Sequence, residues 1–269
     1  MTERVRHRLR AGLILLLIAV SAAACAPKKD VVPRGMLEAD KFLFERGQDL
    51  LARRKWFQAR EYFQQIIENY PQSTFRPEAK IGLGDTYIGE NSTEALVLAQ
   101  NEFKEFLTFY PTHPRADYAQ YRVGFAHFKQ MRGPERDQTE TRDAIAEWQI
   151  FMQRYQKSPL AEEVAARLRE ARDRLADSEY GVGLFYYRVK WYPGAVDRLK
   201  ALLDADPEYT RRDAVYYYLG ESMVALNRGA EALPLFDKLV TEFERSEYLE
   251  KARRQVETLK ATIEAAAKK

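Results

Sequence analysis

From about residue 36 onward, apolar residues recur at the three- and four-residue spacing of helices, without the strict alternation that strands show. One unit occurs five times: an alanine, a bulky apolar residue four positions later, and another apolar residue three positions after that. Residues at these spacings lie on one face of a helix. The five copies are Ala59-Phe63-Ile66, Ala99-Phe103-Phe106, Ala144-Trp148-Phe151, Ala195-Leu199-Leu202 and Ala232-Phe236-Leu239. The pattern predicts an all-α fold.

A glycine lies in the helical stretch that precedes each unit. It stands twelve residues before the alanine at Gly47, Gly183 and Gly220, and farther ahead at Gly84 and Gly124. Because glycine inside a helix costs about 1 kcal/mol relative to alanine, its recurrence predicts two helices in close contact. This combination resembles the tetratricopeptide repeat, with its Leu-Gly-x-x-Tyr first helix and Ala-x-x-x-Phe second helix. The resemblance implies a right-handed superhelix of about five repeats with a C-terminal capping helix.

The repeats are uneven in length. Their alanines are 40, 45, 51 and 37 residues apart, against about 34 in the plain repeat. The excess is assigned to an inserted loop at 131–141 and to a charged helix at 160–177, which we expect to run into the fourth repeat. The predicted repeats span 36–74, 75–114, 115–159, 160–210 and 211–246, with a cap at 247–267. We expect the cap to dock through Leu249, Ala252, Val256, Leu259 and Ile263.

The N-terminus has the layout of a secretory signal. Four arginines precede an apolar run at 12–20, which is too short to span a membrane comfortably, and small residues follow. We therefore predict a signal peptide at 1–24. Those arginines, set against Glu3, account for the formal net charge of +3, so the rest of the chain is balanced. A balanced chain offers no overall basic surface for nucleic acid.

Cys25 is the only cysteine, which excludes an internal disulfide. Its place after small residues resembles a bacterial lipobox, although Ala22 stands where leucine is commoner. The resemblance implies a lipidated Cys25, a flexible tether at 25–35, and no other cofactor. Several acyl chains would hold the protein stably on a membrane. Ordinary cleavage after Ala24, leaving a free thiol, is the alternative. Ala26, in place of aspartate, favours the outer membrane under enterobacterial sorting.

Catalysis and metal binding find little support. His113 and His127 are the histidines beyond the signal, with no cysteine or acidic cluster at metal spacing. His113 is predicted to be a turn residue. The Glu221-Ser222 pair resembles one in lytic transglycosylases, but it follows Gly220, where the repeat already explains it. We therefore predict no catalytic residue, no metal site and no enzyme.

The junction between the second and third repeats is the most specific stretch. Tyr110-Pro111-Thr112-His113-Pro114, then Asp117-Tyr118, Tyr121 and Gly124, resembles the BamD family of outer membrane protein assembly factors, as does Arg136-Asp137 in the insertion. The resemblance covers roughly 36–245. It implies a lipid-anchored scaffold of the β-barrel assembly machinery on the periplasmic face of the outer membrane. Its partners would be BamA, other subunits, and the C-terminal targeting strand of unfolded outer membrane proteins.

Two other envelope proteins with these repeats stay open as alternatives. A pilotin-like secretin-assembly lipoprotein would show more regular repeats, and a Tol-associated cell-division coordinator usually has a coiled coil and no lipobox. A peptidoglycan-cleaving enzyme is the alternative from another class.

In such arrays the first helices line a concave groove. The residue three positions before each glycine would face inward, and aromatic side chains there suit a peptide with alternating aromatic residues. This rule predicts the groove residues Phe44, Ile81, Tyr121, Tyr180 and Tyr217. The third repeat adds Tyr118, Phe125 and Phe128, and the resemblance implies Tyr70 near the mouth of the groove. Packing within the superhelix core is the alternative for each of them. Arg198 matches a basic position in the BamA-facing half of the family, and its alternative is a solvated arginine.

Overall fold

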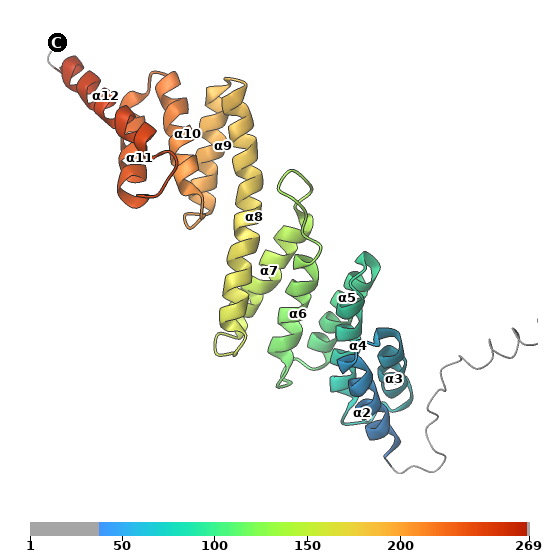
Figure 1. The fold of residues 1–269 in the computed structure, drawn as a ribbon. Coiled ribbons are helices and arrows are strands. Elements are labelled where there is room, and N and C mark those ends of the chain that lie inside the picture. The colour runs from blue at the N-terminus through green and yellow to red at the C-terminus, as the bar shows by residue number, and fades with distance from the viewer. Residues whose placement is uncertain (1–37, 268–269) are drawn as a thin grey trace, which may run out of the picture.

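The computed structural model describes residues 38–267, which form helices joined by turns and loops, with no strand in that range. The predicted all-α fold is confirmed. Successive helices pair as antiparallel neighbours and stack into an elongated array (Figure 1). The pairs are α2 (Ala39–Ala52) with α3 (Trp56–Asn69), α4 (Arg76–Glu90) with α5 (Thr93–Phe109), α6 (Ala116–Phe128) with α7 (Thr139–Arg154), α8 (Ala161–Arg188) with α9 (Tyr192–Ala205), and α10 (Arg212–Ala225) with α11 (Gly229–Glu242), followed by α12 (Leu249–Ala267). None of these helices is long and apolar enough to cross a bilayer. The signal, Cys25 and the tether lie outside the described residues.

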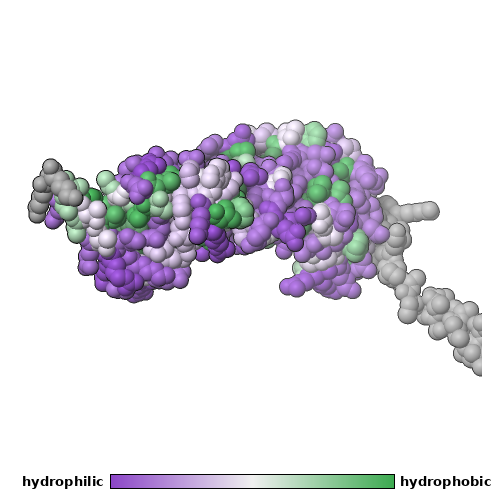
Figure 2. Space-filling model, turned by 90° about the horizontal axis from the view of Figure 1, so that it is seen from above, coloured by the Kyte–Doolittle hydropathy of each residue, from purple (hydrophilic) through white to green (hydrophobic). Residues whose placement is uncertain are grey.

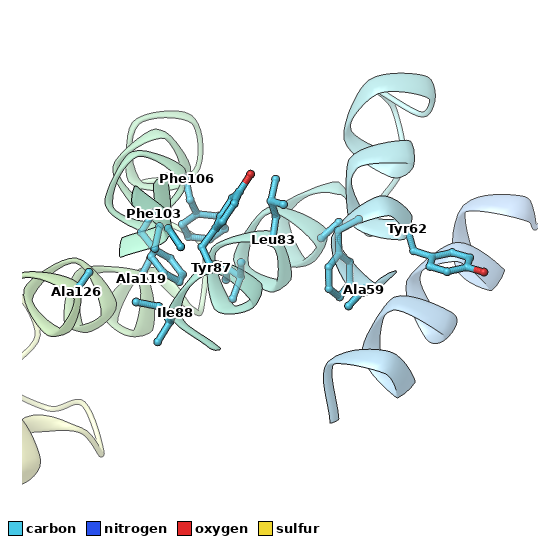
Figure 3. Packing of buried hydrophobic residues seen from close by; sticks show 14 of the residues in the cluster. Ala59, Tyr62, Leu83, Tyr87, Ile88, Phe103, Phe106, Ala119 and Ala126 are labelled. Atoms are coloured by element: carbon cyan, nitrogen blue, oxygen red, sulfur yellow. The ribbon is translucent and has the colours of Figure 1, made fainter. Parts of the chain in front are cut away.

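The repeated alanine unit forms the contact inside each helix pair. All five alanines and all five bulky partners are 0% exposed. Each bulky side chain lies directly on the glycine of the first helix: a Cβ on that glycine would come within 2.4–2.7 Å of it in every pair. In the second pair, Phe103 is the residue that fills this space, among the buried side chains of Figure 3. Burial of one such side chain contributes about 1.5–3 kcal/mol, which outweighs the cost of the glycine.

A serine–aspartate hydrogen bond ties three first helices to the junction that follows their repeat. The hydroxyl of Ser73 donates to Asp40, that of Ser158 to Asp117, and that of Ser246 to Asp213, each over 2.6 Å. Each serine oxygen also accepts a backbone N–H from the residue two positions later, over 3.1 Å. These bonds fix the angle at which the next repeat starts, and the sequence pattern did not reveal them.

The junction between the second and third repeats is built differently. His113 Nδ1 accepts the backbone N–H of Arg115 over 3.2 Å, and the Arg115 guanidinium pairs with Glu78 over 2.8 Å. The prediction that His113 is a turn residue is confirmed. Pro111 lies just past the end of α5, where a proline cannot continue the helix. Pro114 lies two residues before α6, in the turn that the His113 carbonyl closes by accepting the Ala116 N–H.

The long helix α8 joins the two halves of the array. It runs unbroken for 28 residues, about 42 Å at 1.5 Å per residue. Val164 and Leu168, in its first half, pack in the core of the third repeat. Ala176 and Tyr180, in its second half, pack in the core of the fourth and fifth repeats. Figure 1 shows α7 beside the start of this helix and α9 beside its end.

Two sequence-based boundaries need adjustment. The loop inserted in the third repeat ends earlier than expected, because α7 already begins at Thr139, with Gln138 bonded to loop carbonyls just before it. The cap docks through Ala252 and Leu259, which are buried, but Ile263 is 37% exposed. The expected docking of Ile263 is wrong, because the buried contacts of α12 end near Leu259.

Candidate peptide-binding groove

The first helices of the repeats form the inner layer of the array. Beyond the contacts between neighbours in the chain, α2 packs against α4 and α8 packs against α10. First helices that approach one another in this way line the inner side of a curved array. The helix α6 belongs to this inner layer, and its residues on the inner side form the centre of the candidate groove.

Four aromatic side chains follow one face of α6 and are called here the α6 ladder: Tyr118, Tyr121, Phe125 and Phe128. Their spacing of three and four residues places them in a row. Successive ring centroids are 6.4, 5.7 and 6.4 Å apart. Phe128 closes the row against Trp148 of α7, at 5.3 Å. The ladder therefore crosses the inner side of the third repeat as a continuous row of rings in contact.

Three arginines lie over this surface: Arg115 is 4.4 Å from the ring centroid of the first tyrosine, and Arg122 and Arg167 lie over the rings that follow. Arg122 is 5.4 Å from the ring centroids of both Tyr118 and Phe125. Arg167, from the start of α8, is 5.0 Å from Phe125 and 5.5 Å from Phe128. Each contact is a cation–π interaction, and the guanidinium groups leave N–H donors near the aromatic row. The ladder thus combines apolar faces with positive charge.

Carboxylates hold these arginines and the tyrosine hydroxyls in place. Asp85 of α4 accepts the Tyr118 hydroxyl over 2.9 Å and pairs with Arg122 over 2.6 Å. Glu163 accepts the Tyr121 hydroxyl over 2.8 Å and pairs with Arg167 over 2.9 Å. Burial, followed by the bond to Glu163, raises the pKa of Tyr121 to about 12. The hydroxyls therefore stay protonated at neutral pH and act as donors.

A second aromatic group lies on α8, on α10 and in the turn just before α12. Its members are Tyr180, Tyr187, Tyr217, Tyr218 and Tyr248. Tyr217 stacks on Tyr248 at 4.7 Å, and Tyr187 meets Tyr218 edge-on at 4.9 Å. Burial raises the pKa of Tyr180 and of Tyr217 to about 12. This tyrosine cluster packs the two C-terminal repeats together, with its outer rings half-buried.

The predicted groove residues differ in how much surface they present. Phe44, Tyr70, Tyr118, Phe125, Phe128 and Tyr217 are partly exposed. Tyr121 and Tyr180 are only 6% exposed, so their rings form the floor of the surface. Ile81 is 1% exposed within the N-terminal core, which does not present it to any ligand. Phe44 stacks on Phe75 at 5.1 Å, away from the α6 ladder.

Arg198 lies on α9, the second helix of the fourth repeat, and so outside the inner layer of first helices. Its side chain is 53% exposed and stands 3.9 Å from Glu179. It lines a cavity of about 610 Å³ between α7, α8 and α9, together with Arg142, Arg172 and the apolar side chain of Leu175. The cavity opens where α7 and α9 separate along the long α8, so it follows directly from the fused helix.

The Glu221-Ser222 pair, which was considered for catalysis, is hydrogen-bonded within the fold. Ser222 is fully buried and donates its hydroxyl to the Tyr218 carbonyl over 2.7 Å. Glu221 accepts from Gln255 over 2.7 Å, and burial raises its pKa. His127 is different: the fold brings Glu140 and Asp143 beside it, although the sequence showed no acidic cluster at metal spacing.

Arg122, Arg167, Asp85 and Glu163 were not singled out from the sequence. A local signal existed for Arg122, which stands four residues after Tyr118 and thus on the same helix face. No local signal pointed to Arg167, because it comes from the next repeat. An exposed apolar group was also missed at the end of α8, where Phe185, Val189 and Trp191 are 58%, 54% and 53% exposed.

Comparisons with known proteins place the chain near one group. The model of the family described as "YfiO: Outer membrane lipoprotein" matches residues 37–226. The outer membrane protein assembly factor BamD of Caulobacter vibrioides is 26% identical over 219 residues, covering 81% of this chain and 70% of that protein. BamD of Vibrio cholerae is 26% identical over 214 residues, covering 76% and 85%. Among solved structures, the TPR2AB domain of yeast Sti1 overlaps 85% of this chain and 86% of its own, with a TM-score of 0.46 and 13% identity.

Proposed function

The chain belongs to the outer membrane lipoprotein family whose model matches residues 37–226, and from that premise we propose that it is a scaffold of the β-barrel assembly machinery. The curated relatives, which are outer membrane protein assembly factors, support this role. In the proposed role, the inner face binds the C-terminal targeting strand of unfolded outer membrane proteins. The C-terminal half binds BamA, alongside the machinery's other subunits.

The α6 ladder is the observation that carries the peptide proposal. Alternate side chains of an extended strand are about 6.6 Å apart, and successive ladder rings are 5.7–6.4 Å apart. An extended segment with aromatic residues at every second position therefore matches the row in register. Arg122 and Arg167 add donors that suit a terminal carboxylate.

The BamA proposal rests on α9. Arg198 is half-exposed beside the cavity between α7, α8 and α9, where other arginines and apolar side chains also meet. An acidic side chain of BamA could enter this cavity and pair with the guanidinium of Arg198, while apolar side chains of BamA cover Leu175.

Membrane attachment completes the proposal. A diacylated and N-acylated Cys25 would tether the array to the periplasmic face of the outer membrane, with 25–35 as the spacer. The direct test is metabolic labelling with radiolabelled palmitate, which should enter the wild-type protein and be absent from a Cys25→Ser variant. Unchanged labelling of that variant would refute the anchor.

The peptide proposal is tested by fluorescence anisotropy with a labelled C-terminal peptide of an outer membrane β-barrel protein. Phe125→Ala and Arg167→Ala remove parts of the ladder surface, and each is expected to weaken binding at least tenfold. The control is Phe109→Ala on α5, whose ring is 66% exposed and makes no ladder contact; it should bind like the wild type. Unchanged binding in both ladder variants, with the fold intact by circular dichroism, would refute the groove.

The BamA proposal has its own matched pair of variants. Arg198→Glu and Lys200→Glu reverse the same charge on the same helix, but only Arg198 lines the cavity. After affinity purification from solubilised envelope, we expect BamA to be lost with Arg198→Glu and kept with Lys200→Glu. Recovery of a secretin or TolA without BamA from the wild type would overturn the proposed function and favour an alternative.

A further inference from the structure

A polar cluster lies inside the third repeat, apart from the groove. His127 in the last turn of α6 is 6% exposed and Gln100 of α5 is 9% exposed. Glu140 and Asp143 approach the histidine from the first turns of α7. We call Gln100, His127, Glu140 and Asp143 the His127 cluster. It stands at both ends of the loop inserted in this repeat, so whatever binds it also closes that loop.

The two polar contacts of His127 Nδ1 cannot both be hydrogen bonds. Nδ1 is 2.8 Å from a Glu140 oxygen, which requires Nδ1 to donate. The same Nδ1 is 3.2 Å from the Gln100 side-chain nitrogen, which requires it to accept. An imidazole nitrogen does one or the other. Turning the Gln100 amide removes the conflict by placing its oxygen toward Nδ1, and the imidazole nitrogen is then surrounded by oxygens.

A cation bound at Nδ1 satisfies all these groups at once. One ligand atom each from His127, Glu140 and Asp143 already lies within 4.8 Å of the others. Zinc bonds of about 2.0–2.1 Å place tetrahedral ligands about 3.4 Å apart, so rotation of the two partly exposed carboxylates is enough to close the site. The last carbonyls of α6 add partial negative charge nearby.

We propose that His127, Glu140 and Asp143 bind a divalent transition-metal cation, with the amide oxygen of Gln100 as a fourth ligand. The imidazole nitrogen selects zinc, cobalt or nickel over magnesium and calcium, which prefer oxygen ligands only. Glu140 also lines a cavity of about 460 Å³ with Asn91 and Lys129, so a cation could reach the site along this carboxylate. The bound cation would join α6 to α7 across the inserted loop.

Isothermal titration calorimetry of the full chain with zinc chloride tests the site, with magnesium chloride as the contrast. We expect one zinc per chain and no heat from magnesium. Asp143→Asn removes a ligand without touching the His127–Glu140 bond and should weaken zinc binding at least tenfold, as should His127→Gln. His113→Gln removes the other histidine of the described chain and should leave binding unchanged. Zinc uptake that all variants retain equally would show adventitious binding only and overturn the proposal.

Nitrogen-15 spectroscopy gives a readout that a structural histidine would not change. Without metal, the bond to Glu140 places the proton on Nδ1. With zinc on Nδ1, the proton of a neutral ring must lie on Nε2, so the two nitrogen shifts of His127 should exchange character on zinc addition. Shifts of His127 that stay unchanged at saturating zinc would overturn the proposal even if zinc binds elsewhere.

Discussion

Substitution of Gly124 by alanine tests whether glycine is needed in the first helix because a bulky side chain of the second helix occupies the space of its missing Cβ. A Cβ at this position would stand 2.4 Å from Nε1 and 2.5 Å from Cδ1 of Trp148, a ring that is fully buried. That ring must move, and Nε1 then loses its 3.2 Å bond to the Tyr121 carbonyl. Overpacking costs about 1–3 kcal/mol and the lost bond about 1 kcal/mol, while alanine returns about 1 kcal/mol of helix propensity. We expect a net loss of about 1–3 kcal/mol.

Urea unfolding followed by helical circular dichroism at 222 nm measures this change. The matched control is Gly181→Ala in α8, where an added Cβ meets nothing within 4 Å. That variant should gain up to about 1 kcal/mol from helix propensity alone. Because arrays of repeats can unfold in steps, the midpoint should be compared together with the slope. If Gly124→Ala is as stable as Gly181→Ala, the close ring contact does not explain the glycine.

Three further predictions follow from single contacts. Lys190 has a left-handed backbone with φ of 62°, so Lys190→Gly should raise the unfolding free energy by about 1 kcal/mol; an unchanged urea midpoint would contradict this. Asp85→Asn leaves the largely buried Arg122 without its partner and should cost about 2–3 kcal/mol in the same assay, whereas Glu231→Gln, in an exposed pair, should change little. The pKa of Tyr121 is raised to about 12, so its contribution to stability is complete below pH 10 and is lost as pH rises from 10 through 12. The difference in absorbance at 295 nm between the wild type and a Tyr121→Phe variant should show one tyrosine that ionises late, and ionisation of that tyrosine near pH 10 would refute its burial.

The helix pairs and their internal contacts were predictable because they depend on local periodicity. Each alanine unit lies within two turns of one helix, and its buried face follows from spacing alone. The cap was predicted on the same grounds and failed at Ile263, since periodicity shows which face is apolar but not how far the neighbouring helix extends.

The candidate site was only partly predictable. The α6 ladder follows from aromatic residues three and four apart on one helix. Its charged cover does not, because Asp85 comes from the preceding repeat and Arg167 from the following one. Ile81 was predicted to line the groove, with core packing as the alternative, and it lies in the core: spacing along one helix shows which positions face inward but not which of them another helix covers.

The sequence by itself determined the all-α fold, the number of repeats, and the place of each alanine, glycine and aromatic residue that joins two helices of a pair. These are short-range properties that hydrophobic period and steric size decide. Only the tertiary structure decided which tyrosines keep exposed surface, where α7 and α9 part to open a cavity beside Arg198, and that His127 meets two carboxylates. The exposure of the tyrosines and the cavity depend on the angles between repeats, which bonds such as Ser158 to Asp117 set across 41 residues of chain. The His127 contacts depend on how α6 and α7 pack together across the inserted loop.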